Sequence, residues 1–233
     1  MSLSDSALQT LPLQTRPLQT SNLKPPVSTC PPVAEVIASS TREVVAEVYD
    51  GAEVPAFGSW VEVETESGAV LYGLVSHAET GSVEPGRQAV ALGAEYDRET
   101  LRREMPQLLA LIRTTVRVQI LAFWDGKARK GGQPSVRQTL PPQPAALHDR
   151  VHACGDEAVA RFGAPYDYVR TLARHPDPAV PADDLLAAAL GGLYRAYGRG
   201  EAGERVLVEA GRALARLLDD DHERLQSILR RVG

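Results

Sequence analysis

Two histidines and a cysteine lie close together in the second half of the chain and could contribute to a metal site. His148 and His152 are four residues apart, a spacing that places two imidazoles on one helical face. Cys154 follows two residues later, on a different face of such a helix. A structural zinc normally needs four ligands, and the sequence has no second cluster of cysteine and histidine. We therefore interpret this segment as a partly exposed helix start, and we predict no metal and no other cofactor.

A glycine-rich basic segment at 126–137 could bind phosphate groups, and the aromatic residues before it could stack on a nucleobase. The alternative is a solvated loop behind a strand whose aromatic residues anchor the core. We favour this alternative because Asp125 offsets part of the charge and the whole chain is acidic. The segment is nevertheless our prediction for a contact surface, since irregular charged loops on rigid scaffolds commonly bind partners. The predicted contact residues are Phe123, Trp124, Lys127, Arg129, Lys130 and Arg137.

Acidic residues gather at two further places, and neither predicts catalysis. The run 219–221 could bind a divalent cation, but three carboxylates before a helix also complement its dipole, and Asp220 and Glu223 have capping-box spacing. Glu62 and Glu64 alternate along an expected strand and should face water. The sequence contains no G-x-S-x-G nucleophile motif and no G-x-G-x-x-G loop. We therefore predict that the protein is not an enzyme.

Composition favours a protein with a packed core in a reducing compartment. Of the 233 residues, 43% are hydrophobic, and the formal net charge is -5. An acidic balance disfavours attraction of the whole surface to nucleic acid or anionic lipid, although a local basic patch remains compatible with it. The two cysteines form no disulfide framework, and no apolar run is long enough for a membrane span. With no secretory signal recognisable, a cytoplasmic location without membrane contact is expected.

Three regions are predicted along the chain: a tail at 1–32, a β module at 33–146 and a helical module at 147–233. The tail repeats Leu-Gln-Thr every five residues and is rich in proline, serine, threonine and glutamine, which predicts disorder. Its function is either that of a tether or partner motif, or that of a dispensable extension, and composition favours the second.

Short alternating segments separated by glycine-marked turns predict a small antiparallel barrel or sandwich in the β module. Strands are expected at 33–38, 44–49, 60–65, 69–76 and 115–124, with 88–92 as a partner of the last. A helix is expected at 97–112, with Asp97 as its N-cap and an interruption at Pro106. Helices are then expected at about 148–162, 165–174, 183–198, 203–218 and 221–231. The predicted fold class is α+β, with the barrel first and the helices second.

The β module resembles the HAS barrel, the N-terminal module shared by HerA-type DNA translocases and ATP synthase α/β subunits. The segments that carry the resemblance are 33–41, 45–51, 58–64, 71–75, 115–123 and 140–144. In HerA-type enzymes this barrel leads into a RecA-like ATPase, which requires the motif G-x-x-x-x-G-K-[S/T]. Here the nearest Gly-Lys is Gly126-Lys127, which Ala128 follows and no suitably spaced glycine precedes. The resemblance therefore implies subunit contact and partner docking, and it implies no ATPase activity.

The expected function is that of a non-enzymatic adaptor that docks a partner protein through a HAS-like barrel, in the setting of a DNA-processing or DNA-repair ATPase. The amphipathic C-terminal helices should either cap the barrel or mediate self-association into a homo-oligomer. The alternative is a nucleic-acid-binding barrel that uses the basic segment 126–137. A third interpretation, a small-molecule enzyme with a site between barrel and helices, would require a deep pocket with convergent polar groups.

Overall fold

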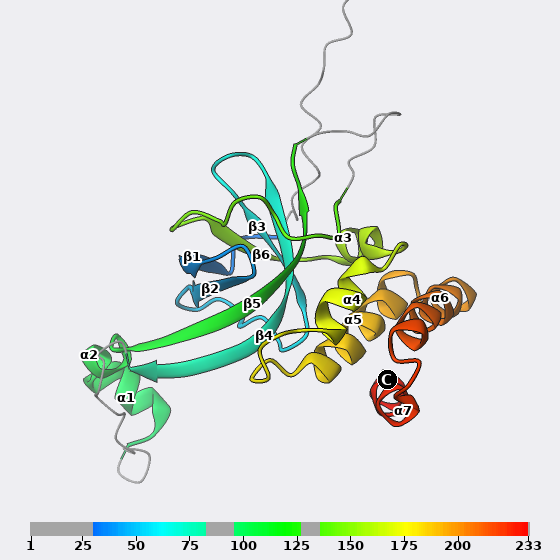
Figure 1. Cartoon of the computed structure of the whole chain (residues 1–233). Helices are drawn as coiled ribbons and strands as arrows, with labels where there is room; N and C mark the ends of the chain where they lie inside the picture. Colours follow the sequence, from blue (N-terminus) through cyan, green and yellow to red (C-terminus); the bar gives the residue numbers. More distant parts are fainter. Residues whose placement is uncertain (1–29, 83–95, 127–135, 233) are drawn as a thin grey trace, which may run out of the picture.

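The computed structural model describes residues 30–82, 96–126 and 136–232, and it shows an α+β fold in which a closed antiparallel barrel precedes a group of helices (Figure 1). The strands follow around the barrel in the order β1-β2-β5-β4-β3-β6, and β6 pairs back with β1. Their bounds are β1 Ala34–Ser39, β2 Glu43–Val48, β3 Trp60–Glu64, β4 Val70–Ser82, β5 Ile112–Trp124 and β6 Arg150–Ala153.

The barrel encloses a core built mainly from β-branched and other aliphatic side chains. Val36, Val44, Val61, Val118 and Val151 are fully buried in it. Along each strand these residues alternate with residues that point outward, as the pleat of a β-strand requires. The alternation of apolar and polar residues that predicts the strands therefore identifies the side chains that lie inside the barrel. The predicted barrel is confirmed.

The last barrel strand corrects the sequence interpretation. A helix was expected at about 148–162, but its first part is β6, which pairs with both β1 and β3. Helical structure begins only with α3, Asp156–Val159, and continues as the 3₁₀ helix η1, Ala160–Phe162. The four residues of β6 contain too little alternation to identify a strand, so its conformation is decided by its two neighbours.

Strands β4 and β5 extend beyond the barrel as a long two-stranded ribbon, which carries α1 and α2 at its far end (Figure 1). Helix α1 spans Arg98–Glu104, and α2 spans Pro106–Leu109. The Asp97 side chain accepts a hydrogen bond from the Thr100 backbone N–H, which confirms the predicted N-cap, and the helix divides before Pro106 as expected. Strand β5 pairs with β2 and with β4. Its expected partner, 88–92, lies outside the described residues.

The C-terminal helices cover one outer wall of the barrel. They are α4 Asp167–Ala173, α5 Ala182–Ala196, α6 Glu201–Leu217 and α7 His222–Arg230, close to the predicted ranges. Trp60 on β3 stacks on Phe162, with ring centroids 4.1 Å apart, and meets the edge of Tyr168 at 5.4 Å. These rings join a second core that continues through Leu186 and Leu190 of α5. Of the two roles expected for the helices, capping the barrel is the one that the fold displays.

Glu62 corrects a second expectation, because its side chain is fully buried and does not face water. It lies on the outer side of the barrel wall, between Tyr72 of β4 and His152 of β6 in register. Alternation correctly assigned Glu62 to the outside of the barrel, but this wall is covered by the helical module. Burial next to the Glu62 charge also raises the pKa of the Tyr72 hydroxyl well above its usual value.

Candidate functional site

The predicted basic surface is only partly within the described residues. Lys127, Arg129 and Lys130 lie outside them, and their role stays a prediction. Arg137 is held against the barrel: its guanidinium lies 3.0 Å from an Asp125 carboxylate oxygen and 5.9 Å from the centre of the Phe123 ring. Backbone hydrogen bonds in both directions join it to the same phenylalanine.

The two aromatic residues of that predicted surface lie in the hydrophobic cores. Phe123 is 6% exposed and belongs to the barrel interior, whereas Trp124 is 2% exposed and packs between barrel and helices. Rings this deeply buried cannot stack on a base in this conformation. Their position agrees with the interpretation of a strand that anchors the core.

The histidine and cysteine residues near β6 have separate surroundings. His148 lies before the strand with a positive φ of 72° and forms a hydrogen bond with Glu35, so it shares no helical face with His152. The His152 Nδ1–H donates to the Cys30 carbonyl oxygen at 2.9 Å. Burial raises the pKa of the Cys154 thiol, which keeps it protonated and weakly nucleophilic. Within the described parts of the chain, no three histidine, cysteine or acidic residues are placed to share a metal ion.

The acidic run at 219–221 begins helix α7. The Asp221 side chain accepts a hydrogen bond from the Arg224 backbone N–H at 3.0 Å, so the N-cap is Asp221 and the predicted Asp220 is wrong by one residue. The Arg224 guanidinium in turn reaches Asp183 on α5 at 2.7 Å. Capping accounts for the Asp221 carboxylate without any ligand.

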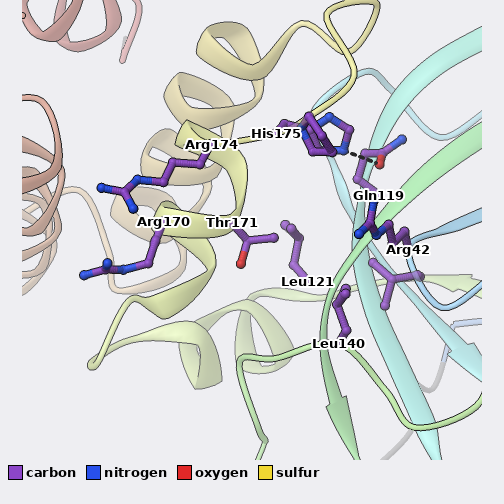
Figure 2. Close-up of a pocket in the computed structure, with 10 residues that line it drawn as sticks. Arg42, Gln119, Leu121, Leu140, Arg170, Thr171, Arg174 and His175 are labelled. Atoms are coloured by element: carbon purple, nitrogen blue, oxygen red, sulfur yellow. Dashed lines mark hydrogen bonds between the residues drawn. The ribbon is translucent and has the colours of Figure 1, made fainter.

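A pocket of about 410 Å³ lies between strand β5 of the barrel and helix α4 (Figure 2). Ile120 and Leu121 form its barrel side, and α4 contributes Thr171. Leu140, which comes from the chain before β6, is 40% exposed beside it. A bulge in β5, where the pairing moves from Tyr72 to Gly73 on β4, turns consecutive residues of β5 outward beneath the helices.

Three arginines give this pocket its charge. Arg42 approaches from the turn between β1 and β2, while Arg170 lies on α4 and Arg174 is the C-cap of the same helix, one helical turn further on. All three are exposed, and within the part of the chain that the structure describes none of them forms an ion pair. The described lining contains no carboxylate. The pocket therefore combines positive charge with an apolar wall.

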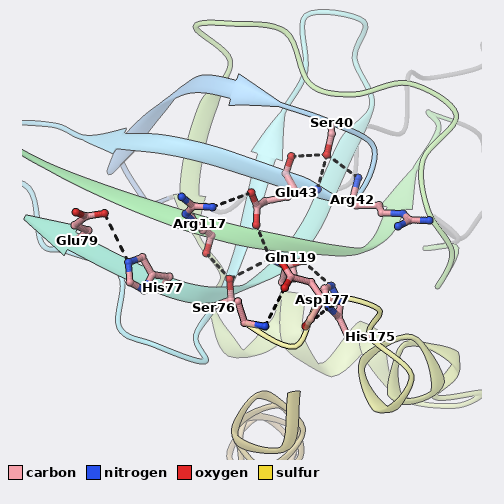
Figure 3. Close-up of polar contacts among 11 residues, drawn as sticks. Ser40, Arg42, Glu43, Ser76, His77, Glu79, Arg117, Gln119, His175 and Asp177 are labelled. Atoms are coloured by element: carbon pink, nitrogen blue, oxygen red, sulfur yellow. Dashed lines mark hydrogen bonds and ion pairs between the residues drawn. The ribbon is translucent and has the colours of Figure 1, made fainter. Parts of the chain in front are cut away.

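Gln119 fixes the geometry at one end of the pocket (Figure 3). Its side chain is 3% exposed, and its amide nitrogen donates to Glu43 Oε2 at 2.8 Å and to Ser76 Oγ at 3.2 Å. The remaining amide oxygen must then accept a hydrogen bond, which His175 Nε2 donates at 3.1 Å. His175 Nδ1 accepts from the Asp177 backbone N–H at 3.2 Å, as a neutral imidazole can. One glutamine thus connects three barrel strands to the loop after α4.

This network does not form a nucleophile activated by a base. Gln119 lies between Ser76 and His175, and the Ser76 hydroxyl donates to the Arg117 carbonyl oxygen at 3.2 Å. A nucleophilic serine would need a direct hydrogen bond to its base. The arrangement therefore provides a rigid, positively charged surface with apolar floor, suited to binding.

Comparison with protein-family models found no match, and comparison with curated protein sequences found none either. The residues of the pocket were missed by sequence reasoning because they come from separate segments that only the fold brings together. The one local signal is the spacing of Arg170 and Arg174, which places two cations on one helical face. No described helix is both long and apolar enough to cross a bilayer.

Proposed function

We propose that this protein is a non-enzymatic adaptor that docks a partner protein through its barrel, at the pocket between β5 and α4. The observation that carries the proposal is the lining of that pocket, where three arginines that form no ion pair within the described residues lie beside the exposed side chain of Leu140. Charge complementarity and a small apolar anchor are the usual basis of selective docking. The resemblance to the HAS barrel favours an oligomeric DNA-processing ATPase in the cytoplasm as the assembly to which the adaptor binds.

The arrangement of the two cores supports a scaffold that presents a preformed surface. Val169 and Leu172 of α4 are fully buried against the barrel and α5, so the arginines of this helix stand on a fixed support. Gln138 adds a second connection: its amide donates to the Gly163 carbonyl oxygen at 2.8 Å and accepts the Asp167 backbone N–H at 2.8 Å. A preformed surface loses little conformational entropy on binding, which favours affinity.

Affinity capture from the source organism tests the proposal when wild type is compared with a charge-reversed pocket. An adaptor should retain a stoichiometric partner, which chemical crosslinking and mass spectrometry then place on the barrel. A protein that stays monomeric and captures no partner under gentle extraction would contradict the adaptor function. Self-association into a homo-oligomer is measured in the same samples by light scattering.

The rival function is binding of nucleic acid, which the three pocket arginines together with the basic segment 126–137 favour. Its signature is affinity for oligonucleotides that falls steeply with salt, because phosphate contacts release counterions. We rank it second since the described pocket lining contains no phenylalanine, tyrosine or tryptophan for base stacking.

A further inference from the structure

We propose that the partner segment bound in the pocket between β5 and α4 is a short acidic peptide with one aliphatic anchor. The anchor would lie against Leu121 and Leu140, and carboxylates on either side would reach Arg42 and the pair on α4. This inference rests on the adaptor function proposed above and adds the chemistry of the partner.

Charge is the first argument. The chain carries 30 acidic and 25 basic residues, yet the described lining of the pocket contains no carboxylate. Some arginines elsewhere on the described surface do pair with a carboxylate, such as Arg113 with Glu47 at 3.7 Å and Arg231 with Asp184 at 2.7 Å. Three arginines line one pocket and form no ion pair within the described residues, so a ligand that carries carboxylates complements their charge.

The positions of the three guanidinium groups favour an extended ligand over a single small anion. In Figure 2, Arg170 and Arg174 extend side by side from the outer side of α4, away from Leu121 and Gln119, whereas Arg42 lies on the barrel side near that glutamine. Guanidinium groups on the two sides of the seam between α4 and β5 favour a ligand with several separate carboxylates over one phosphate. A peptide chain that crosses the seam and carries several carboxylates can reach both sides.

The apolar wall favours a peptide over a polynucleotide. Leu140 is 40% exposed although it borders a pocket, and Leu121 and Ile120 form a buried floor beside it. A space of about 410 Å³ holds a small group such as an aliphatic side chain together with its neighbouring backbone. The described lining contains no phenylalanine, tyrosine or tryptophan on which a base could stack.

The test is selection of random short peptides, displayed on phage, against the full-length protein. We expect the selected sequences to combine aspartate or glutamate with one leucine, isoleucine or valine. Fluorescence anisotropy with the labelled peptides then compares wild type with the double variant Arg170→Glu and Arg174→Glu. We expect binding to weaken roughly tenfold or more in this variant, since charge-assisted hydrogen bonds are lost and repulsion replaces them.

A matched control is present on helix α6, where Arg212 and Arg216 are exposed and also lie one helical turn apart. Their double charge reversal changes the net charge by the same amount and should leave peptide binding unchanged. Leu140→Ser should weaken binding without altering the dependence on salt. The single variant Arg42→Glu serves the same comparison if the α4 double variant does not fold, as judged by urea denaturation.

Selection that yields no acidic peptides would overturn the inference, and so would selected peptides that bind the α4 variant as tightly as wild type. A third contrary result is that oligo-dT displaces the peptides and that its own binding requires the same arginines. The adaptor function fails separately. A partner that the α4 variant still captures would leave the adaptor in place and remove this site, whereas capture of no partner by wild type would contradict the adaptor itself.

Discussion

Substitution of Gly73 by alanine should destabilise the barrel far more than the same change at Gly81, although both glycines lie on strand β4. At Gly73 a new Cβ would clash with the Gln119 carbonyl oxygen and would lie 2.6 Å from Val118 Cγ1 and 2.9 Å from the Gln119 carbonyl carbon. At Gly81 no atom lies within 4 Å of the added carbon. The two positions therefore differ in the close approach of β5.

The size of the effect follows from these contacts. Carbon atoms pack at about 3.5–4.0 Å, so the new methyl group overlaps its neighbours by about 1 Å. Two of those neighbours are backbone atoms, and no change of rotamer can move them. Strand β4 would have to shift away from β5 at the bulge, which we expect to cost about 3 kcal/mol, the upper end for overpacking in a core. Gly81→Ala should change stability by less than about 1 kcal/mol.

Urea denaturation measures the difference, with fluorescence from Trp60 and Trp124 as the signal because both indoles are buried at the barrel–helix boundary. With an m value of about 2 kcal/mol per molar urea, the midpoint of Gly73→Ala should fall by about 1.5 M. An equal midpoint for the two variants would refute the reasoning. The shift also moves Gln119, so peptide binding should weaken in Gly73→Ala and persist in Gly81→Ala.

Three further outcomes are expected. Burial, and then a hydrogen bond to a glutamate, raise the pKa of Tyr166 to about 12, so the native state keeps a proton that the unfolded chain releases near pH 10. Stability should therefore fall between about pH 10 and 12, and urea midpoints of Tyr166→Phe should fall less; equal slopes would contradict this. Gln138→Ala leaves the Gly163 carbonyl and the Asp167 N–H without their partner and should cost about 2–3 kcal/mol in the same assay, whereas a loss below about 1 kcal/mol would mean that water replaces the amide. Asp221→Ala removes the α7 cap and should cost about 1 kcal/mol, while Asp220→Ala should cost little; the reverse order would place the cap at Asp220.

Much of the barrel could be predicted because its strands carry their own signal. In the β5 sequence, Val116, Val118 and Ile120 alternate with outward-facing residues, and the structure buries all three inside the barrel. Strand β6 carries no such signal, since Val151 is its only residue inside the barrel. The sequence also does not indicate which outer wall of the barrel the helices cover, and for that reason it predicts that Glu62 faces water.

The candidate site could not be predicted, because its residues are remote in sequence and individually ordinary. From the sequence, Arg42 is predicted to be an exposed cation in a turn, and Gln119 is predicted to be an outward-facing residue of a strand. They form one pocket only because α4 packs over β5, and the packing of the core between barrel and helices fixes that position. Phe123 and Trp124 fit a contact surface by sequence because aromatic residues beside basic ones are typical of nucleic-acid surfaces, but the same residue types also build cores.

Closure of the barrel by β6 affects how the chain is synthesised and how it can be cut. Strand β1 acquires its second neighbour only when Val151 arrives, after nearly the entire barrel has left the ribosome. Until then β1 and β3 present open hydrogen-bonding edges, which can recruit strands from other nascent chains. A fragment that stops at residue 146 would keep those edges permanently and should exchange strands or precipitate, so expression of the isolated barrel needs to extend beyond Ala153.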